Sequence, residues 1–328
     1  MTIWFFKNDS RQTPEKEFFM KSKAKEILNE VKKVIIGKDD VLAKVFMTIL
    51  SGGHILLEDV PGVGKTTLAI AFSRALGLDY KRIQFTSDSV PSDIIGFSVF
   101  NKTSGKFIYN PGAVMTHLLL ADEINRTSSK TQSALLEVME EGNVTVDGTT
   151  YPVPSPFFVL ATQNPIGSAG TQMLPASQLD RFMICVSMGY PDFASQINIL
   201  KDRHTENPIN FVLPVSNREE IIDMQKTVSA VFIADSIYEY ITRLAEATRT
   251  NPIVTLGISP RGALAVCQMA KAFAYIHDRD FVVPEDVKAV FGDVCAHRLI
   301  LHPKARIANK TAFLIIEEII SDVQMPLV

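Results

Sequence analysis

The sequence has few cysteines, a single tryptophan and no long apolar run. Its 3 cysteines, Cys185, Cys267 and Cys295, lack the spacing of metal ligands and leave an odd thiol, so we expect reduced core cysteines rather than a disulfide framework. No apolar stretch approaches the roughly 18 to 20 residues that a membrane-spanning helix needs. Residues 1–9 lack the apolar segment and cleavage site of a signal peptide. We therefore expect a cytoplasmic protein without a membrane span.

The chain also lacks a large excess of charge of either sign. Its 33 Lys and Arg against 36 Asp and Glu leave a formal net charge of −3, which argues against a general nucleic-acid coat protein. Hydrophobic residues at 46% and charged residues at 21% are typical of globular proteins and exclude a disordered chain, a collagen-like repeat and a coiled coil. A chain of 328 residues is too long for one hydrophobic core and suits two domains.

Short apolar runs alternate with helical patterns in the first part of the chain. The runs are continuously hydrophobic, which is typical of strands buried on both faces of a parallel α/β sheet. The expected strands are 55–57, 82–85, 118–121, 157–161 and 183–186, and the clearest helices between them are 66–76 and 130–141.

The amino-terminal segment precedes this alternation. Residues 1–15 are expected to form a loose extension. From Lys16 onward apolar residues recur at spacings of three and four, which predicts a helix that Gly37 ends. We place the α/β domain at residues 16–190.

Residues 191–328 show helical patterns and no strand pattern, so we expect a small all-helical domain there. Ser236 with Glu239 fits a helix-starting capping box. Ser259 followed by Pro260 is a second helix start, with a capping hydroxyl and a proline in the first turn.

The segment 58–67 lies between the first buried strand and an amphipathic helix, and its residues are typical of a phosphate-binding loop. Glycines let backbone N–H groups approach phosphate oxygens, and the helix start adds a partial positive charge. Lys65 can reach the β- and γ-phosphates of a nucleotide, and the Thr66 hydroxyl can bind Mg²⁺. The expected nucleotide-binding residues are Pro61, Gly62, Val63, Gly64, Lys65, Thr66 and Thr67.

One position departs from the usual pattern of such a loop. The pattern has glycine five residues before Gly64, and this chain has Asp59 there. Gly62 must then make the first tight turn.

Two further strands end in polar side chains. The strand 118–121 is followed by Asp122 and Glu123, and burying adjacent acids without partners is costly. Mg²⁺ would compensate Asp122, and Glu123 is placed to orient and deprotonate a water molecule. The strand 157–161 leads to Asn164, whose amide could hold the attacking water against the γ-phosphate.

Taken together, these motifs resemble the MoxR family of AAA+ ATPases. The matching segments are PGVGKT (61–66), LLLADEINR (118–126), ATQNP (161–165), QLDRF (178–182) and ISPRGAL (258–264), and the resemblance extends over about residues 24–320. It implies an ATP- and Mg²⁺-dependent ATPase with a parallel sheet of order 5-1-4-3-2, a helical lid, and assembly into a homo-oligomeric, usually hexameric, ring.

The resemblance also assigns roles to single residues. Lys65 and Thr66 match the Walker A pair, and Asp122 and Glu123 match Walker B. Asn164 matches sensor 1.

Two arginines match residues that complete the site. Arg261 matches sensor 2, and from the first turn of its helix it could cross the domain cleft to the γ-phosphate. Arg181 is the best match to an arginine finger that acts on a neighbouring subunit, which in related systems accelerates hydrolysis about 10³- to 10⁵-fold. Arg126 is a competing candidate for the finger. Residues 34–37, with Ile36 and Gly37, resemble the segment that lines the adenine pocket, although an ordinary helix end explains them nearly as well.

Two predicted hairpins bear on the partner of this ring. One lies within residues 94–112 and the other within 142–154, where Asp147-Gly148 favours a type I′ turn. They correspond to the helix-2 insert and the pre-sensor 1 hairpin of the family.

Residues 141–156 contain no Lys or Arg, and the first hairpin has only Lys102 and Lys106, so contacts with nucleic-acid phosphates are not expected. We therefore expect protein clients. By resemblance these include von Willebrand factor A-type partners and proteins that receive a metal cofactor. A helicase-like DNA motor and a slow nucleotide-gated binding module are the alternatives.

Overall fold

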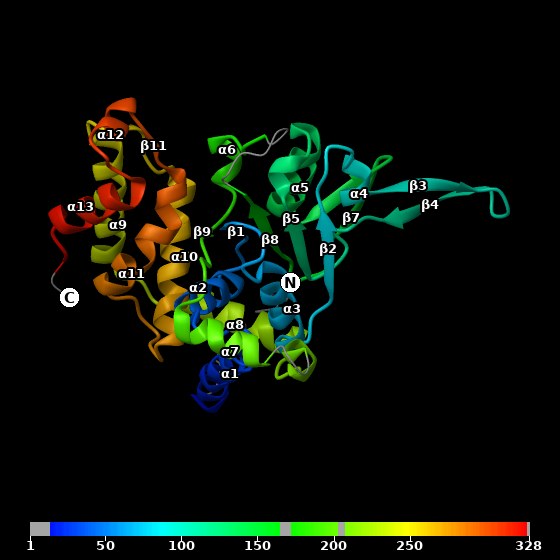
Figure 1. The fold of residues 1–328 in the computed structure, drawn as a ribbon, viewed down its shortest axis with the longest axis horizontal. Helices are drawn as coiled ribbons and strands as arrows, with labels where there is room; N and C mark the ends of the chain where they lie inside the picture. Colours follow the sequence, from blue (N-terminus) through cyan, green and yellow to red (C-terminus); the bar gives the residue numbers. More distant parts are fainter. Residues whose placement is uncertain (1–13, 165–171, 203–206, 327–328) are drawn as a thin grey trace, which may run out of the picture.

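The computed structural model describes residues 14–164, 172–202 and 207–326, and it places a parallel β-sheet between helices (Figure 1). The extension predicted for residues 1–15 lies outside the described residues, except that Pro14 and Glu15 open helix α1 (Pro14–Lys32).

The central sheet has five parallel strands. They are β1 (Ile55–Glu58), β2 (Tyr80–Gln84), β5 (Leu118–Asp122), β8 (Phe158–Gln163) and β9 (Ile184–Val186), in the spatial order β2-β5-β8-β1-β9. Numbered along the chain and read from the β9 edge, this order is 5-1-4-3-2. The predicted strands and their order are confirmed.

Alternate residues of the inner strands face opposite sides of the sheet. Leu57 and Leu120 pack into one hydrophobic cluster with helices α1, α2 (Asp39–Leu50) and α3 (Lys65–Ala75). Leu56 and Leu119 pack into a second cluster with α5 (Ser129–Glu141). Burial on both faces explains why these strands are continuously apolar in the sequence.

Helices dominate the part of the chain after β9, as predicted. They are α7 (Phe193–Asp202), α8 (Arg218–Ala230), α9 (Asp235–Thr250), α10 (Pro260–Ile276), α11 (Pro284–Cys295), α12 (Pro303–Ile307) and α13 (Ala312–Asp322). One addition is an antiparallel ladder of β10 (Val254–Leu256) and β11 (Ile300–Leu301), too short to show as a pattern in the sequence.

Arg298 joins these later helices to the sheet. Its side chain is 3% exposed, and its Nε lies 2.7 Å from Asp180 Oδ1. The same guanidinium donates to the carbonyls of Phe182 at 2.6 Å and Met183 at 3.1 Å, just before β9. A buried, fully partnered guanidinium holds both segments in one geometry.

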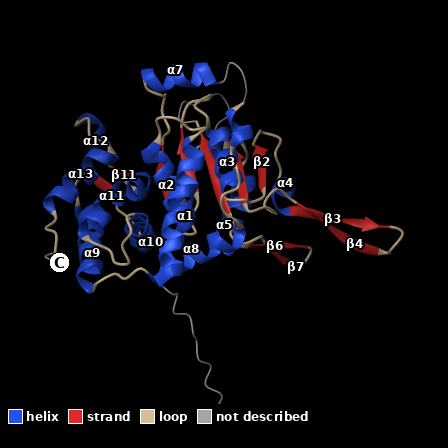
Figure 2. Cartoon of the chain, turned by 90° about the horizontal axis from the view of Figure 1, so that it is seen from below, coloured by secondary structure: helices blue, strands red, loops and turns tan. Residues whose placement is uncertain are grey.

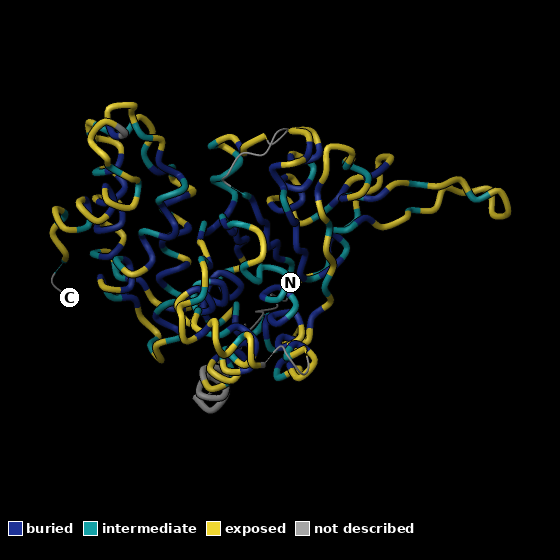
Figure 3. The backbone as a smooth tube through the Cα atoms, in the orientation of Figure 1, coloured by how far each residue is buried: buried dark blue, intermediate teal, exposed yellow. Residues whose placement is uncertain are grey.

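Two hairpins extend from the α/β part beside the short helix α4 (Pro91–Ile95) (Figures 1 and 2). The longer one is β3 (Gly96–Asn101) with β4 (Lys106–Pro111), and Figure 3 shows it mostly exposed. The shorter one is β6 (Asn143–Val146) with β7 (Thr149–Pro152). Its turn residues Asp147 and Gly148 have φ of 49° and 78°, as the predicted type I′ turn requires.

Two predicted helix boundaries are wrong. Helix α1 ends at Lys32 rather than Gly37, because Lys33 and Val34 already bond to carbonyls three residues back. Gly37 adopts a φ of 71° in the turn that follows. Helix α9 begins one residue before Ser236, because the carbonyl of Ala234 accepts its first hydrogen bonds.

Over the described ranges, we find no helix both long and apolar enough to cross a lipid bilayer.

His54, which precedes β1, is buried in a geometry that requires its neutral form. Its Nδ1 accepts a hydrogen bond from the N–H of Val159 at 3.0 Å, and its Nε2 lies 3.0 Å from the carbonyl of Met139. Burial lowers the pKa of His54 to about 4, and the bond to Met139 opposes this shift only in part.

Replacing His54 with Gln should flatten the dependence of stability on pH. The unfolded chain binds a proton at His54 below about pH 6.5 and the folded chain does not until about pH 4, so this group removes stability as the pH falls between these values. Wild type should lose about 1.4 kcal/mol per pH unit more than His54→Gln across this window. Urea unfolding at a series of pH values measures the difference, and parallel curves would contradict it.

Candidate functional site

The loop between β1 and α3 turns at its glycines. Gly62 and Gly64 have φ of 87° and 97°, a region that favours glycine, and Gly64 immediately precedes the first turn of α3. Gly62 makes the first tight turn, as the sequence indicates for a loop without the earlier glycine. The N–H groups at the start of α3 are thereby exposed beside Lys65 and Thr66.

Asp59, which replaces that earlier glycine, anchors the loop to the segment after β9. Its buried carboxylate accepts hydrogen bonds from Ser187 Oγ at 2.8 Å and from the N–H groups of Met188 and Gly189. Its carbonyl accepts from Lys65 Nζ at 3.0 Å. Asp59, the residue that departs from the usual motif, thus tethers the loop to residues 187–189.

The two carboxylates at the carboxyl end of β5, Asp122 and Glu123, lie at the same edge of the sheet. Asp122 Oδ1 accepts from Thr162 Oγ1 at 2.7 Å, and Thr162 Oγ1 accepts from the N–H of Glu123 at 2.8 Å. Glu123 has a φ of 57°, in the left-handed region that non-glycine residues rarely adopt. Thr162 therefore sets the relative position of the two acids.

Both acids are paired with arginines. Asp122 Oδ2 lies 2.6 Å from Arg82 Nη2, and Glu123 Oε2 lies 2.9 Å from Arg126 Nη1. Arg82 comes from the edge strand β2. Arg126 follows Glu123 by three residues.

Asn164 follows β8, the strand between β1 and β5. Its carbonyl accepts from Asn125 Nδ2 at 3.1 Å. The preceding Gln163 donates to Glu58, and its own Oε1 is buried without a hydrogen-bond partner.

These elements enclose one cavity of about 330 Å³. Its lining residues are Pro61, Gly62, Gly64, Lys65, Thr66, Arg82, Gln84, Asp122, Glu123 and Asn164. Burial lowers the pKa of Lys65, while Asp59, Asp122 and Glu123 oppose the shift.

The donors of this cavity fit a nucleotide with its magnesium. Lys65, the loop and the helix start suit phosphates, and the Asp122 carboxylate and Thr66 hydroxyl are oxygen ligands of the kind Mg²⁺ takes.

Arg82 and Gln84 line this cavity, and the sequence reasoning missed them. Their signal is the spacing of two, which puts both on one face of a strand just before its carboxyl end. Strand β2 pairs directly with the strand that delivers the two acids.

Arg181 and Arg261 meet on a single carboxylate. Arg181 Nη2 lies 3.1 Å from Glu140 Oε2, and Arg261 donates to the other oxygen of Glu140. Neither arginine lines the cavity around Lys65.

Their position is at the opposite edge of the sheet. Helix α5 starts just after β5 and ends at Glu141, so Glu140 lies near the amino ends of the strands, where Met139 meets His54. The expected path from Arg261 across the domain cleft to the γ-phosphate stays a prediction, and in this structure Arg261 lies away from the cavity around Lys65. The reason is that α10 begins at the amino edge of the sheet.

Ile36 and Gly37 also lie outside the lining of the cavity. Gly37 faces Ser195 at the start of α7, and the adjacent Lys38 donates to the carbonyl of Tyr190 at 2.8 Å. Their role beside an adenine stays a prediction.

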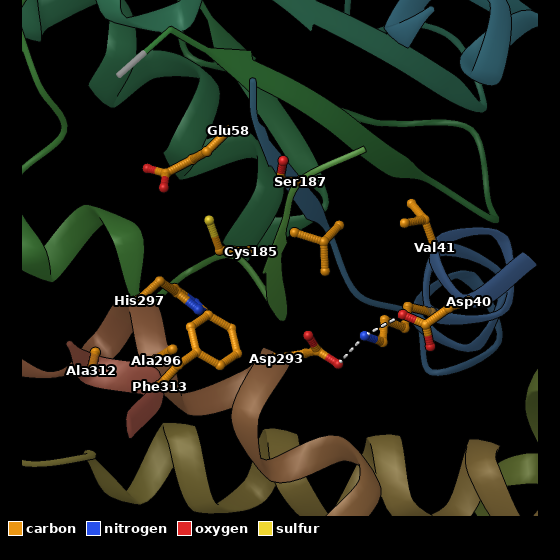
Figure 4. A pocket seen from close by; sticks show the side chains of 12 residues that line it. Asp40, Val41, Glu58, Cys185, Ser187, Asp293, Ala296, His297, Ala312 and Phe313 are labelled. Atoms are coloured by element: carbon orange, nitrogen blue, oxygen red, sulfur yellow. Dashed lines mark ion pairs between the residues drawn. The ribbon is translucent and has the colours of Figure 1, made fainter. Parts of the chain in front are cut away.

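A second cavity, of about 570 Å³, lies where α2, the ends of β1 and β9, and helices α11 and α13 meet (Figure 4). Lys44 lines this cavity and forms ion pairs with Asp40 at 2.6 Å and Asp293 at 2.9 Å. Glu58 lines it from β1.

Comparisons with known proteins agree with this geometry. Residues 54–184 match the ATPase family associated with various cellular activities (AAA), and residues 246–319 match the AAA lid domain. The chain is 46% identical to the uncharacterized protein YeaC of Bacillus subtilis, over 91% of this chain and 93% of that protein. It is 38% identical to chaperone MoxR1 of Mycobacterium tuberculosis, over 90% of this chain and 81% of that protein.

A solved structure is also similar. The crystal structure of a putative ATPase from Cytophaga hutchinsonii superposes with a TM-score of 0.89 at 37% identity, covering 95% of this chain and 98% of that one.

Replacing Asp59 with Ala should destabilise the fold, because it leaves the buried N–H of Met188 and the partly buried N–H of Gly189 without an acceptor. We expect the free energy of unfolding in urea to fall by about 3 kcal/mol. Asp59→Asn should lose less, since its amide oxygen can still accept. Asp79→Ala is the control, because that carboxylate is 85% exposed and its loss should change stability by no more than about 0.5 kcal/mol. Equal effects of Asp59→Ala and Asp79→Ala would refute the tether.

Proposed function

Because the chain belongs to the MoxR-type AAA ATPases, we propose that it binds and hydrolyses ATP with Mg²⁺ and uses the cycle to remodel or mature partner proteins. One observation carries this proposal. A single cavity brings together the phosphate loop with Lys65 and Thr66, the acids Asp122 and Glu123, and Asn164.

The residues divide the work of hydrolysis in the proposed site. Loop N–H groups and Lys65 bind the phosphates, and the Thr66 hydroxyl and Asp122 would hold Mg²⁺. The metal supplies charge neutralisation on the phosphates. Glu123 takes a proton from the attacking water, for which its carboxylate must leave Arg126, and Asn164 orients that water.

We further propose that the chain acts as a homo-oligomeric ring, a hexamer by family resemblance, in which each site is completed by a neighbour. The support is that Arg181 lies at the amino edge of the sheet, away from the cavity of its own chain. Arg261 shares Glu140 with Arg181, so we assign both arginines to the nucleotide of the adjacent subunit. Arg126, the other candidate finger, is paired with Glu123 of its own site.

The proposed clients are proteins. The β3–β4 hairpin exposes Phe97, Phe100 and Phe107 on its strands, with Phe107 71% exposed. Such aromatic surface suits contact with a polypeptide. The relative MoxR1 is named a chaperone, which supports the same class of work.

The shorter hairpin contributes differently. Its Val144 and Val146 are buried, and Tyr151 stacks on Tyr109 of the longer hairpin with ring centroids 4.1 Å apart. We therefore assign client contact to the β3–β4 hairpin, and von Willebrand factor A-type or metal-cofactor proteins are the classes to test first.

Glu123→Gln should abolish ATP hydrolysis while ATP binding remains. The amide keeps the size of the side chain and cannot accept the proton, so we expect a rate loss of at least about 100-fold. Phosphate release and titration of a fluorescent ATP analogue measure the two properties. Lys65→Ala is the matched variant and should lose binding itself. Hydrolysis by Glu123→Gln at the wild-type rate would overturn the catalytic assignment.

Mixing two inactive variants should restore activity if Arg181 acts on a neighbour. Arg181→Ala keeps its own binding site, and Lys65→Ala keeps its finger, so mixed assemblies contain some complete sites. We expect each variant alone to hydrolyse ATP about 10³-fold more slowly than wild type or worse, and the mixture to recover a clear fraction. Absence of recovery in co-purified mixed assemblies would exclude action in trans.

A further inference from the structure

Arg82 is a cation inside the proposed nucleotide site that no assigned role explains. It lies on the edge strand β2 and lines the same cavity as Lys65, Thr66 and Glu123. It is not part of the phosphate loop or of the loop that follows β5.

The contacts of Arg82 put its charge on the carboxylate that would hold the metal. Its Nη2 lies 2.6 Å from Asp122 Oδ2 and 3.3 Å from Gln84 Oε1. The other oxygen of Asp122 accepts from Thr162. Both oxygens of this carboxylate therefore have partners, and that of Oδ2 is Arg82.

The ion pair between Arg82 and Asp122 can also be broken. The Arg82 side chain is 41% exposed, whereas that of Asp122 is 12% exposed, so the arginine can move and the carboxylate cannot move far. A guanidinium and a divalent cation repel each other, so they compete for this carboxylate. A metal held by Asp122 would weaken this ion pair, and the released Arg82 would remain beside the cavity, where a bound terminal phosphate would attract it.

We propose that Arg82 is a catalytic residue that leaves Asp122 when nucleotide and metal bind and then contacts the terminal phosphate of ATP in its own chain. This inference rests on the proposed ATPase function. In the nucleotide-free chain Arg82 pairs with the carboxylate that would hold the metal, and in the loaded site it would stabilise charge on the transferring phosphoryl group.

Arg82→Met tests the two roles with different readouts. Removing a competing cation should lower the Mg²⁺ concentration that half-maximally enhances binding of fluorescent ADP, by about threefold or more. The preference for a slowly hydrolysed ATP analogue over ADP should shrink, because a contact to the terminal phosphate is lost. In hydrolysis, kcat should fall about 10- to 100-fold.

Two variants on the same strand complete the test. Lys81→Met is the control, because Lys81 donates to the carbonyl of Gly112 at 3.2 Å and does not line the cavity. It should match wild type in all three measurements. Arg82→Lys keeps the charge, so its Mg²⁺ midpoint should stay near that of wild type while kcat falls. It also serves as the test variant if Arg82→Met does not fold.

The outcomes separate this inference from the proposed function. If wild type shows no Mg²⁺-enhanced nucleotide binding, the ATPase proposal fails and this inference falls with it. If wild type responds and Arg82→Met has an unchanged or higher Mg²⁺ midpoint, the inference alone is overturned. An unchanged kcat in both Arg82 variants overturns it as well.

Discussion

The position of β8 between β1 and β5 is the constraint on which the candidate site depends. Parallel pairing aligns Glu58 of β1 with Gln163, so the phosphate loop and Asn164 leave the sheet at the same level. On the side of β8 that pairs with β5, the Thr162 hydroxyl donates a hydrogen bond to Asp122 and accepts one from the N–H of Glu123. A different strand order would separate the loop from the acids, whatever the motifs themselves contained.

Charge balance is the second condition that the site meets. Two acids side by side at the end of a buried strand are stable only with compensating partners. In this chain each acid has its own arginine, and Lys65 is held by a carbonyl rather than by a carboxylate. The positive charge that would bind a triphosphate is therefore already present at the site. Part of it, on Arg82 and Arg126, is paired with Asp122 and Glu123, the two acids that act in the proposed reaction.

The sequence predicts the strands and the loop well, because these depend on local patterns, whereas the strand order follows only from the resemblance to the MoxR family. Continuous apolar runs define the buried strands, and Gly62 makes the first tight turn, as expected for a loop that has Asp59 in place of the usual glycine. The role of Asp59 could not be predicted, since its partners lie about 130 residues further along the chain.

Side-chain contacts between distant segments account for the other differences. The place of Arg261 depends on where α10 begins relative to the sheet, which periodicity does not encode. Its meeting with Arg181 on Glu140 joins three segments of the chain. The pairing of Arg82 with Asp122 likewise follows from which strands are neighbours, so it becomes visible only once the sheet is assembled.

The buried guanidinium of Arg298 has a mechanical consequence for the proposed multi-subunit assembly. Arg298 belongs to the lid, and it donates hydrogen bonds to Asp180 and Phe182, the residues on either side of residue 181. The lid and the segment that carries Arg181 are therefore held together as one rigid unit. In the proposed ring, a rotation of the lid would therefore move Arg181 with it, and the tilt of one protomer would set the distance between this arginine and the nucleotide of the neighbouring subunit.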